Sequence, residues 1–215
     1  MNPNRFFRAV ALAVSLAALA AFFTAVSAIV PTPALAQNGA KVIALPAPDK
    51  TGGKPLMQAL ALRHSTRSFT EEAISDQDLS NLLWAVWGIN RDDGRHTAPT
   101  AKNKQAVAVF AARADGVWRY DPVAHSLVQY LSKDIRASIG EAPLVLLYAA
   151  PADDPAAGFH IGALHQNAGL YCASADLGSV VKVTGADEAD KILDLPDGYK
   201  VMIVQPVGHP KEIEN

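Results

Sequence analysis

The sequence has a single cysteine, Cys172, so it can form no intramolecular disulfide and no zinc site built from several cysteines. Cys172 lies in the apolar stretch GLYCASADLG, where a free thiol packs as a small hydrophobic residue. We therefore expect a buried and inert thiol. His160 and His165 are five residues apart and would not share a helix face, which argues against a metal pair.

Several motifs of catalysis are also missing from the chain. It has no Gly-rich dinucleotide loop, no Walker loop and no Ser-x-Gly elbow. It also has no Cys/His pair and no evident pair of catalytic carboxylates. Nothing here supports hydrolase chemistry, and a bound phosphate would be held by arginines rather than by a glycine loop.

An excess of positive charge is absent as well. The 19 Lys and Arg stand against 21 Asp and Glu, a formal net charge of −2. Loss of the first 36 residues would remove two Arg and leave 17 basic residues against 21 acidic ones, a charge of −4. A mildly acidic chain argues against nucleic acid as a partner.

The N-terminus has the pattern of an export signal. Arg5 and Arg8 precede a long apolar run, and Ala34 and Ala36 form the A-x-A pattern that signal peptidase accepts. We expect a signal peptide at residues 1–36, cleaved after Ala36, and an exported, periplasmic mature protein. The apolar run is longer than most signal sequences, so a retained membrane anchor is the alternative.

The remaining chain predicts a flexible linker at residues 37–55 and one domain at residues 56–215. The linker expectation rests on the Gly, Pro and Lys content of residues 38–55. Hydrophobic periodicity and capping residues predict helices at 56–64, 76–87 and 158–177, the last stopped by Gly178. Strands are expected at 106–112, 117–120, 126–130, 143–150 and 199–208, with 143–150 central. Hairpins without strict βαβ alternation indicate an α+β fold.

Three polar segments are candidates for chemistry, and each has an ordinary alternative. In RHSTR, Arg63 and Arg67 could bind a phosphate. The same residues are also typical of a charged helix end. In APTAKNKQ, Asn103 could bond the edge of a heterocycle, or the segment could be a plain polar turn. Gln166 and Asn167 lie in an otherwise small and apolar helix, where unpaired amides are costly.

Taken in order, these segments resemble the nitroreductase family of FMN-dependent oxidoreductases. The resemblance rests on RHSTRSF, APTAKNKQ, DGVWRYD, HQNAGLYCASADLGSV and VQPVGHP, and it covers about Leu56 to Pro210. The nearest branch is the one that includes peptide-azoline dehydrogenases. The resemblance implies a mainly antiparallel sheet flanked by helices and an intertwined homodimer with FMN at its interface.

The resemblance also assigns residues to FMN. It implies that Arg63, Ser65 and Arg67 hold the phosphate, with His64 close to the flavin. The turn of Pro99, Thr100, Ala101, Lys102 and Asn103 would contact the isoalloxazine, and Asn103 its pyrimidine edge. Gly178, Ser179, Val180 and Val181 would approach the ring by main chain. Many relatives carry a further cation beyond the last strand, for which Lys211 is the candidate here.

The implied activity is a ping-pong cycle in which NAD(P)H is the reductant and a small organic acceptor, such as a nitro compound or quinone, is reduced. Export makes the supply of FMN and NAD(P)H outside the cytoplasm an open question. Two alternatives therefore stand beside it. One is an exported flavin-binding electron carrier, or degenerate homologue, without nicotinamide turnover. The other is a peptide-azoline dehydrogenase.

Overall fold

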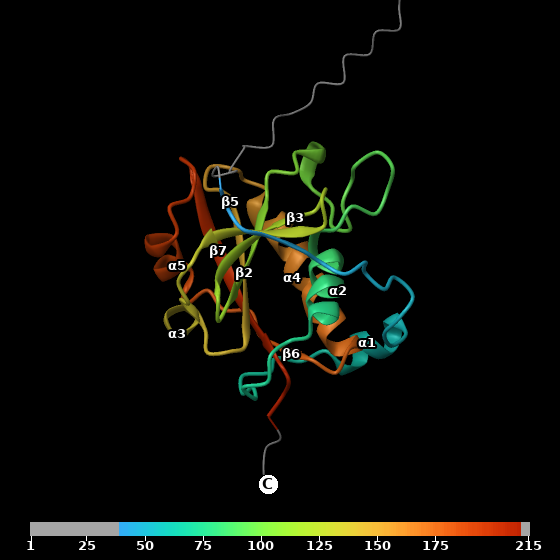
Figure 1. Ribbon diagram of the computed structural model, residues 1–215. Helices are drawn as coiled ribbons and strands as arrows, with labels where there is room; N and C mark the ends of the chain where they lie inside the picture. The colour runs from blue at the N-terminus through green and yellow to red at the C-terminus, as the bar shows by residue number, and fades with distance from the viewer. Residues whose placement is uncertain (1–38, 212–215) are drawn as a thin grey trace, which may run out of the picture. The chain divides into compact units, whose positions relative to one another are not determined.

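A seven-stranded sheet forms the centre of the fold (Figure 1). The computed structural model describes residues 39–211. The strands follow the order β1-β4-β3-β2-β5-β7-β6, and each is antiparallel to its neighbours. Their bounds are β1 Val42–Ala44, β2 Ala108–Arg113, β3 Gly116–Asp121, β4 Ser126–Leu131, β5 Leu144–Pro151, β6 Gly178–Ser179 and β7 Tyr199–Gly208.

Helices cover both faces of this sheet (Figure 1). Helices α2 (Asp76–Trp87) and α4 (Ala157–Ser174) pack on one face, while α3 (Arg136–Ile139) and α5 (Ala186–Ile192) pack on the other. Helix α1 (Leu56–Leu62) lies beside α4. The α+β class and the antiparallel sheet flanked by helices are confirmed.

The alternation of side chains along β5 explains why two cores form. Leu144, Leu146 and Tyr148 face α2 and α4, whereas Val145 and Leu147 face α3 and α5. All five side chains are buried because β5 lies between β2 and β7 with helices on both sides. The central position predicted for this apolar run is confirmed.

Helix α2 forms as its sequence predicts. The Ser75 hydroxyl accepts a hydrogen bond from the Asp78 main-chain N–H at 3.0 Å, which caps the helix. Leu79, Leu82 and Val86 recur on one face and are buried against the sheet. Gly88 follows as the C-terminal cap.

The predicted linker, residues 37–55, contains an edge strand that its composition did not indicate. Residues 42–44 form β1, which pairs with β4 at the edge of the sheet. The Asp49 N–H donates to the Asn81 side chain at 2.8 Å, and Lys54 Nζ lies 2.6 Å from the Asp176 carboxylate. Glycine and proline gave this stretch the composition of a linker, but three apolar residues supply an edge strand.

The predicted stop of the long helix was also misplaced. Helix α4 ends at Ser174, and Asp176 takes the left-handed conformation with a φ of 57°. Aspartate tolerates this conformation better than most residues, so no glycine is needed there. Gly178 instead begins β6.

The predicted signal peptide, residues 1–36, lies outside the residues that the structure describes and stays a prediction. Between residues 39 and 211, no helix is both long and apolar enough to cross a membrane.

Candidate functional site

The segment from Arg63 to Thr70 crosses the open side of β6. Ser65 pairs with Ser179 in a parallel bridge, and the Thr66 N–H donates to the Ser179 carbonyl at 3.0 Å. Further on, the Thr70 N–H donates to the His209 carbonyl at 3.0 Å. This pairing brings the predicted phosphate segment and the predicted ring segment together.

Gly178 allows this close approach. A Cβ atom at Gly178 would lie 2.6–2.8 Å from the side chain of Thr66, a distance that real Cβ atoms do not adopt. The next residue, Ser179, accepts a hydrogen bond from Gln205 Nε2 at 3.2 Å. Tyr148 donates to Gln205 Oε1 at 2.7 Å in the same buried network, which fixes β6 against β7 and β5.

The cations of the segment are free to bind an anion. Arg63, Ser65 and Arg67 are exposed, and no carboxylate among residues 39–211 forms a salt bridge with either arginine. The aliphatic part of Arg63 lies against Gly169 of α4. Desolvation is the main cause that lowers the pKa of His165, and the positive charge of Arg63 lowers it further.

His64 and Lys211 flank the same segment. His64 Nδ1 donates to the Leu62 carbonyl at 2.8 Å, because a carbonyl can only accept, and the ring is exposed. The Lys211 N–H donates to the Ser68 carbonyl at 3.0 Å, and its side chain is exposed. Lys211 therefore lies beside the segment that carries Arg67.

The strand edge after Ser179 presents unpaired main-chain groups. The N–H groups of Val180 and Lys182 donate to carbonyls of β7, at 3.2 Å to Pro206 and 2.9 Å to Val204. Because successive N–H groups of extended backbone point to opposite sides, the N–H of Val181, between these two, faces away from β7. The N–H groups of Val181 and Val183 have no hydrogen-bond acceptor among the described residues.

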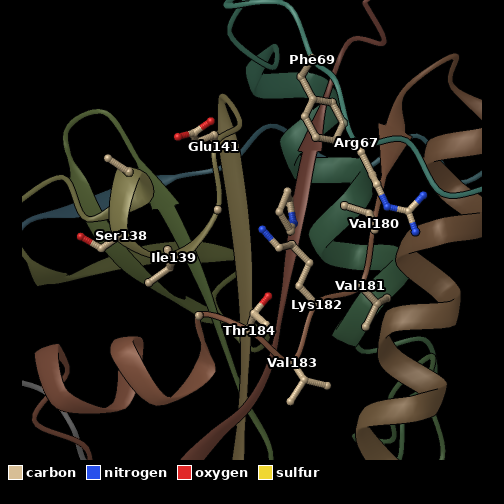
Figure 2. A pocket seen from close by; sticks show the side chains of 14 residues that line it. Arg67, Phe69, Ser138, Ile139, Glu141, Val180, Val181, Lys182, Val183 and Thr184 are labelled. Carbon is tan, nitrogen blue, oxygen red and sulfur yellow. The ribbon is translucent and has the colours of Figure 1, made fainter.

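A cavity of about 600 Å³ opens along this edge, within the range of small-molecule sites (Figure 2). We call it the β6 cavity. Figure 2 shows Lys182 reaching into it between Val180 and the segment that carries Glu141. Its lining is Arg67, Phe69, Ala137, Ser138, Ile139, Gly140, Glu141, Val180, Val181, Lys182, Val183, Thr184, Gly185 and Pro206.

Some of this lining was not expected from the sequence. Lys182 directly follows the stretch assigned to the ring and could have been included on that ground. Residues 137–141 carry no such signal. They reach the cavity because Gly185, with a φ of 98°, lies against Ile139, where a Cβ would be 2.5 Å from the Ile139 carbonyl oxygen.

The predicted ring-contacting turn, Pro99 to Asn103, does not line the β6 cavity. Its Ala101 N–H donates to His160 near the start of α4 at 2.8 Å. Arg63, by contrast, contacts Gly169, and these two points of α4 are about 14 Å apart along the helix at 1.5 Å per residue. Within one chain, the predicted residues thus form two groups.

Two other expectations concern α4. Asn167 donates to the Ala85 carbonyl at 3.0 Å and joins α4 to α2, while Gln166 is exposed. Cys172 is buried, and burial raises the pKa of its thiol to about 12, as expected of an inert residue. No group of three metal-ligating side chains occurs in the described part of the chain.

Comparison with known proteins identifies relatives over the same region. The pattern that defines the Nitroreductase family matches residues 60–209. A protein of Methanocaldococcus jannaschii, named as a nitroreductase, is 27% identical over 184 residues, which are 73% of this chain and 92% of that protein.

Two solved structures are similar to this chain. A nitroreductase-like protein of Ralstonia eutropha is 35% identical, with a TM-score of 0.75 over 80% of this chain and 90% of its own. A nitroreductase of Desulfitobacterium hafniense with bound FMN is 19% identical, with a TM-score of 0.51 over 74% and 90% of the two chains.

Proposed function

Because the chain belongs to the nitroreductase family, whose members are FMN-dependent oxidoreductases, we propose that it binds FMN and uses NAD(P)H to reduce a small organic acceptor. Nitro compounds and quinones are the acceptor classes we propose. FMN, when bound, would supply the two-electron chemistry in a ping-pong cycle. The chain itself would bind and orient the participants.

The observation that carries this proposal is the pair of unpaired arginines beside an open strand edge. Arg63 and Arg67 have no carboxylate partner among residues 39–211. A phosphate could therefore bind both arginines without displacing a carboxylate. Guanidinium groups bind phosphate through two parallel hydrogen bonds. Ser65 would add a hydroxyl, and Lys211 a further positive charge.

The flavin ring would lie against the outward N–H group of Val181, next to the N–H of Val183. Neither group has a hydrogen-bond acceptor among the described residues, so each could donate to an acceptor atom of the ring. The side chains of Val181 and Val183 are 38% and 75% exposed, so the edge is accessible. Gly178 and Ser179 would hold this edge in place through Thr66 and Gln205.

The separate position of residues 99–103 supports a homodimer. Since this turn does not line the β6 cavity of its own chain, we propose that it contacts the flavin of the partner subunit. Helix α1 supplies an apolar surface for such a partner, with Leu56 64% and Met57 75% exposed, and Phe159 of α4 is 82% exposed. Exposed apolar side chains on neighbouring helices are typical of subunit contacts.

We also propose that the chain is exported to the periplasm after cleavage at Ala36, with a membrane-anchored form as the alternative. This location favours one rival function. If no NAD(P)H reaches the protein there, it would serve as a flavin-binding electron carrier, reduced by another donor.

Turnover measurements test the proposal. The purified protein is supplied with FMN, NADH or NADPH, and either menadione or a nitroaromatic acid. We expect oxidation of the nicotinamide that requires both FMN and the acceptor. FMN binding without nicotinamide oxidation would support the carrier, and absence of FMN binding would refute both functions.

A further inference from the structure

A buried histidine holds the turn that carries Lys102 and Asn103. His160 is 3% exposed, and its Nε2 atom accepts the Ala101 main-chain N–H at 2.8 Å. On the other side of the ring, Nδ1 lies 3.8 Å from Oδ2 of Asp154. The turn and the start of α4 are therefore joined through one imidazole.

This arrangement fixes the tautomer of the histidine. An N–H group only donates, so the nitrogen that faces Ala101 must carry no proton. The proton of neutral His160 is then on Nδ1, which faces the carboxylate of Asp154. A carboxylate at this position favours the Nδ1–H form and keeps Nε2 available as the acceptor.

Asp154 is itself held in place. Its side chain is 4% exposed, and Oδ1 accepts hydrogen bonds from the Ala156 N–H at 3.0 Å and from Lys104 Nζ at 3.3 Å. The Ala156 N–H, more than Lys104, lowers the pKa of this carboxyl against the opposing effect of desolvation. The carboxylate thus binds Lys104 directly and lies 3.8 Å from Nδ1 of His160, longer than a hydrogen bond.

The turn needs such support because its backbone is strained. Lys102, Asn103 and Gln105 have φ values of 54°, 54° and 52°, in the left-handed region that residues other than glycine seldom adopt. Three such residues within four positions persist only where the surroundings hold them. The Thr100 hydroxyl accepts the Gln105 N–H at 3.1 Å, and His160 supplies the contact from outside the turn.

We infer that His160, with the Asp154 carboxylate beside it, is a positioning residue that sets Lys102 and Asn103 at the pyrimidine edge of the flavin. This inference rests on the proposed function, in which residues 99–103 contact the flavin. His160 does not touch the flavin in this account. It acts through the main chain of Ala101, which fixes the direction of the following two side chains.

The first test is hydrogen exchange of the Ala101 amide in the full chain without FMN. In His160→Leu the acceptor is lost, and we expect the amides of residues 101–105 to exchange about tenfold faster, the factor of a single lost hydrogen bond. His160→Gln places an amide oxygen near the position of Nε2 and should restore slow exchange. His125→Leu is the matched control, since His125 is part-buried and bonds the Pro46 carbonyl in a separate cluster.

The second test measures the midpoint potential of bound FMN. Donors near the pyrimidine edge stabilise the reduced, anionic ring, so a displaced turn should make the midpoint potential of bound FMN more negative. We expect this shift in His160→Leu and Asp154→Asn, its reversal in His160→Gln, and an unchanged potential in His125→Leu.

The two tests separate the inference from the proposed function. Unchanged exchange in His160→Leu, or equal potentials in all four variants, would overturn the positioning role. Faster exchange in a chain that binds no FMN would overturn the proposed function, and the role toward the flavin with it.

Discussion

Arg63 and Arg67 are the residues on which the cofactor assignment depends. Both are exposed cations without a carboxylate partner in the described chain, and both lie on a segment fixed to β6 by main-chain pairing. Taken by itself, RHSTR favoured a solvated, charged helix end over a phosphate site. The structure adds that the segment lies beside Ser179 and Lys211, which a helix end alone would not require.

The first prediction concerns Arg63. Replacement by alanine removes a charge-assisted contact to phosphate, so we expect FMN affinity to fall by about 1.5–3 kcal/mol, roughly tenfold or more. Fluorescence titration with FMN measures this change. Lys191→Ala is the control, because Lys191 is exposed on α5 and pairs only with Glu188 among the described residues. Equal FMN affinity in Arg63→Ala and wild type would refute the phosphate assignment.

The sequence assigned some residues of the candidate site and left others unassigned. The residues at 63–67 and 178–181 come together because Thr66 and Ser179 pair, and both segments were assigned from the family resemblance. Glu141 and Ser138 could not be predicted, since their place in the β6 cavity depends on the packing of Gly185 against Ile139. Such contacts arise from tertiary structure and leave no local pattern in the sequence.

At the scale of elements, long and strongly patterned segments were predictable. Helix α2, the buried strand β5 and the last strand β7 follow from capping, apolar runs and turn residues. The short elements β1, β6, α3 and α5, of three, two, four and seven residues, were missed. Elements this short are stabilised by their neighbours rather than by their own sequence.

The second prediction concerns the cap of α2. Ser75→Ala removes the acceptor of the Asp78 N–H, so we expect the free energy of unfolding to fall by about 1 kcal/mol. Urea denaturation measures this change. Ser132→Ala is the control, because Ser132 is exposed and no side-chain hydrogen bond is seen for it in the described structure. An equal decrease in the free energy of unfolding in both variants would show that the Ser75 cap does not stabilise α2.

At the scale of the whole molecule, three histidines link stability to pH. Desolvation is the main cause that lowers the pKa of His96, His125 and His165 in the folded protein. Each of these groups binds fewer protons when folded than when unfolded. Their contribution to stability is therefore complete above the unfolded pKa and is lost as the pH falls through the window below it.

The third prediction follows from this linkage. We expect the free energy of unfolding to decrease as the pH falls from about 7 to about 5.5, below the unfolded histidine pKa of about 6.5. The lowered carboxyl pKa values of Asp49 and Asp134 act only below about pH 4, outside this window. Denaturation at both pH values measures the slope, which should be shallower in His125→Gln. A stability that stays constant or rises over this interval would contradict the prediction.

The division of the candidate site is also a property of the whole molecule. Residues 63–67 and residues 99–103 contact α4 at different points, so one chain does not bring them to the β6 cavity together. The order of motifs along the sequence could not show this. In the homodimer that we propose, the exposed apolar residues of α1 would contact the second subunit.

The visible absorption spectrum of the purified protein, before and after anaerobic addition of NADH or NADPH, tests the central claim most directly. The fourth prediction is that the protein shows flavin bands, with or without added FMN, and that these bands bleach with a nicotinamide. Bands that persist would contradict nicotinamide-dependent turnover and favour an electron carrier. A protein that binds no FMN under any of these conditions would contradict the account as a whole.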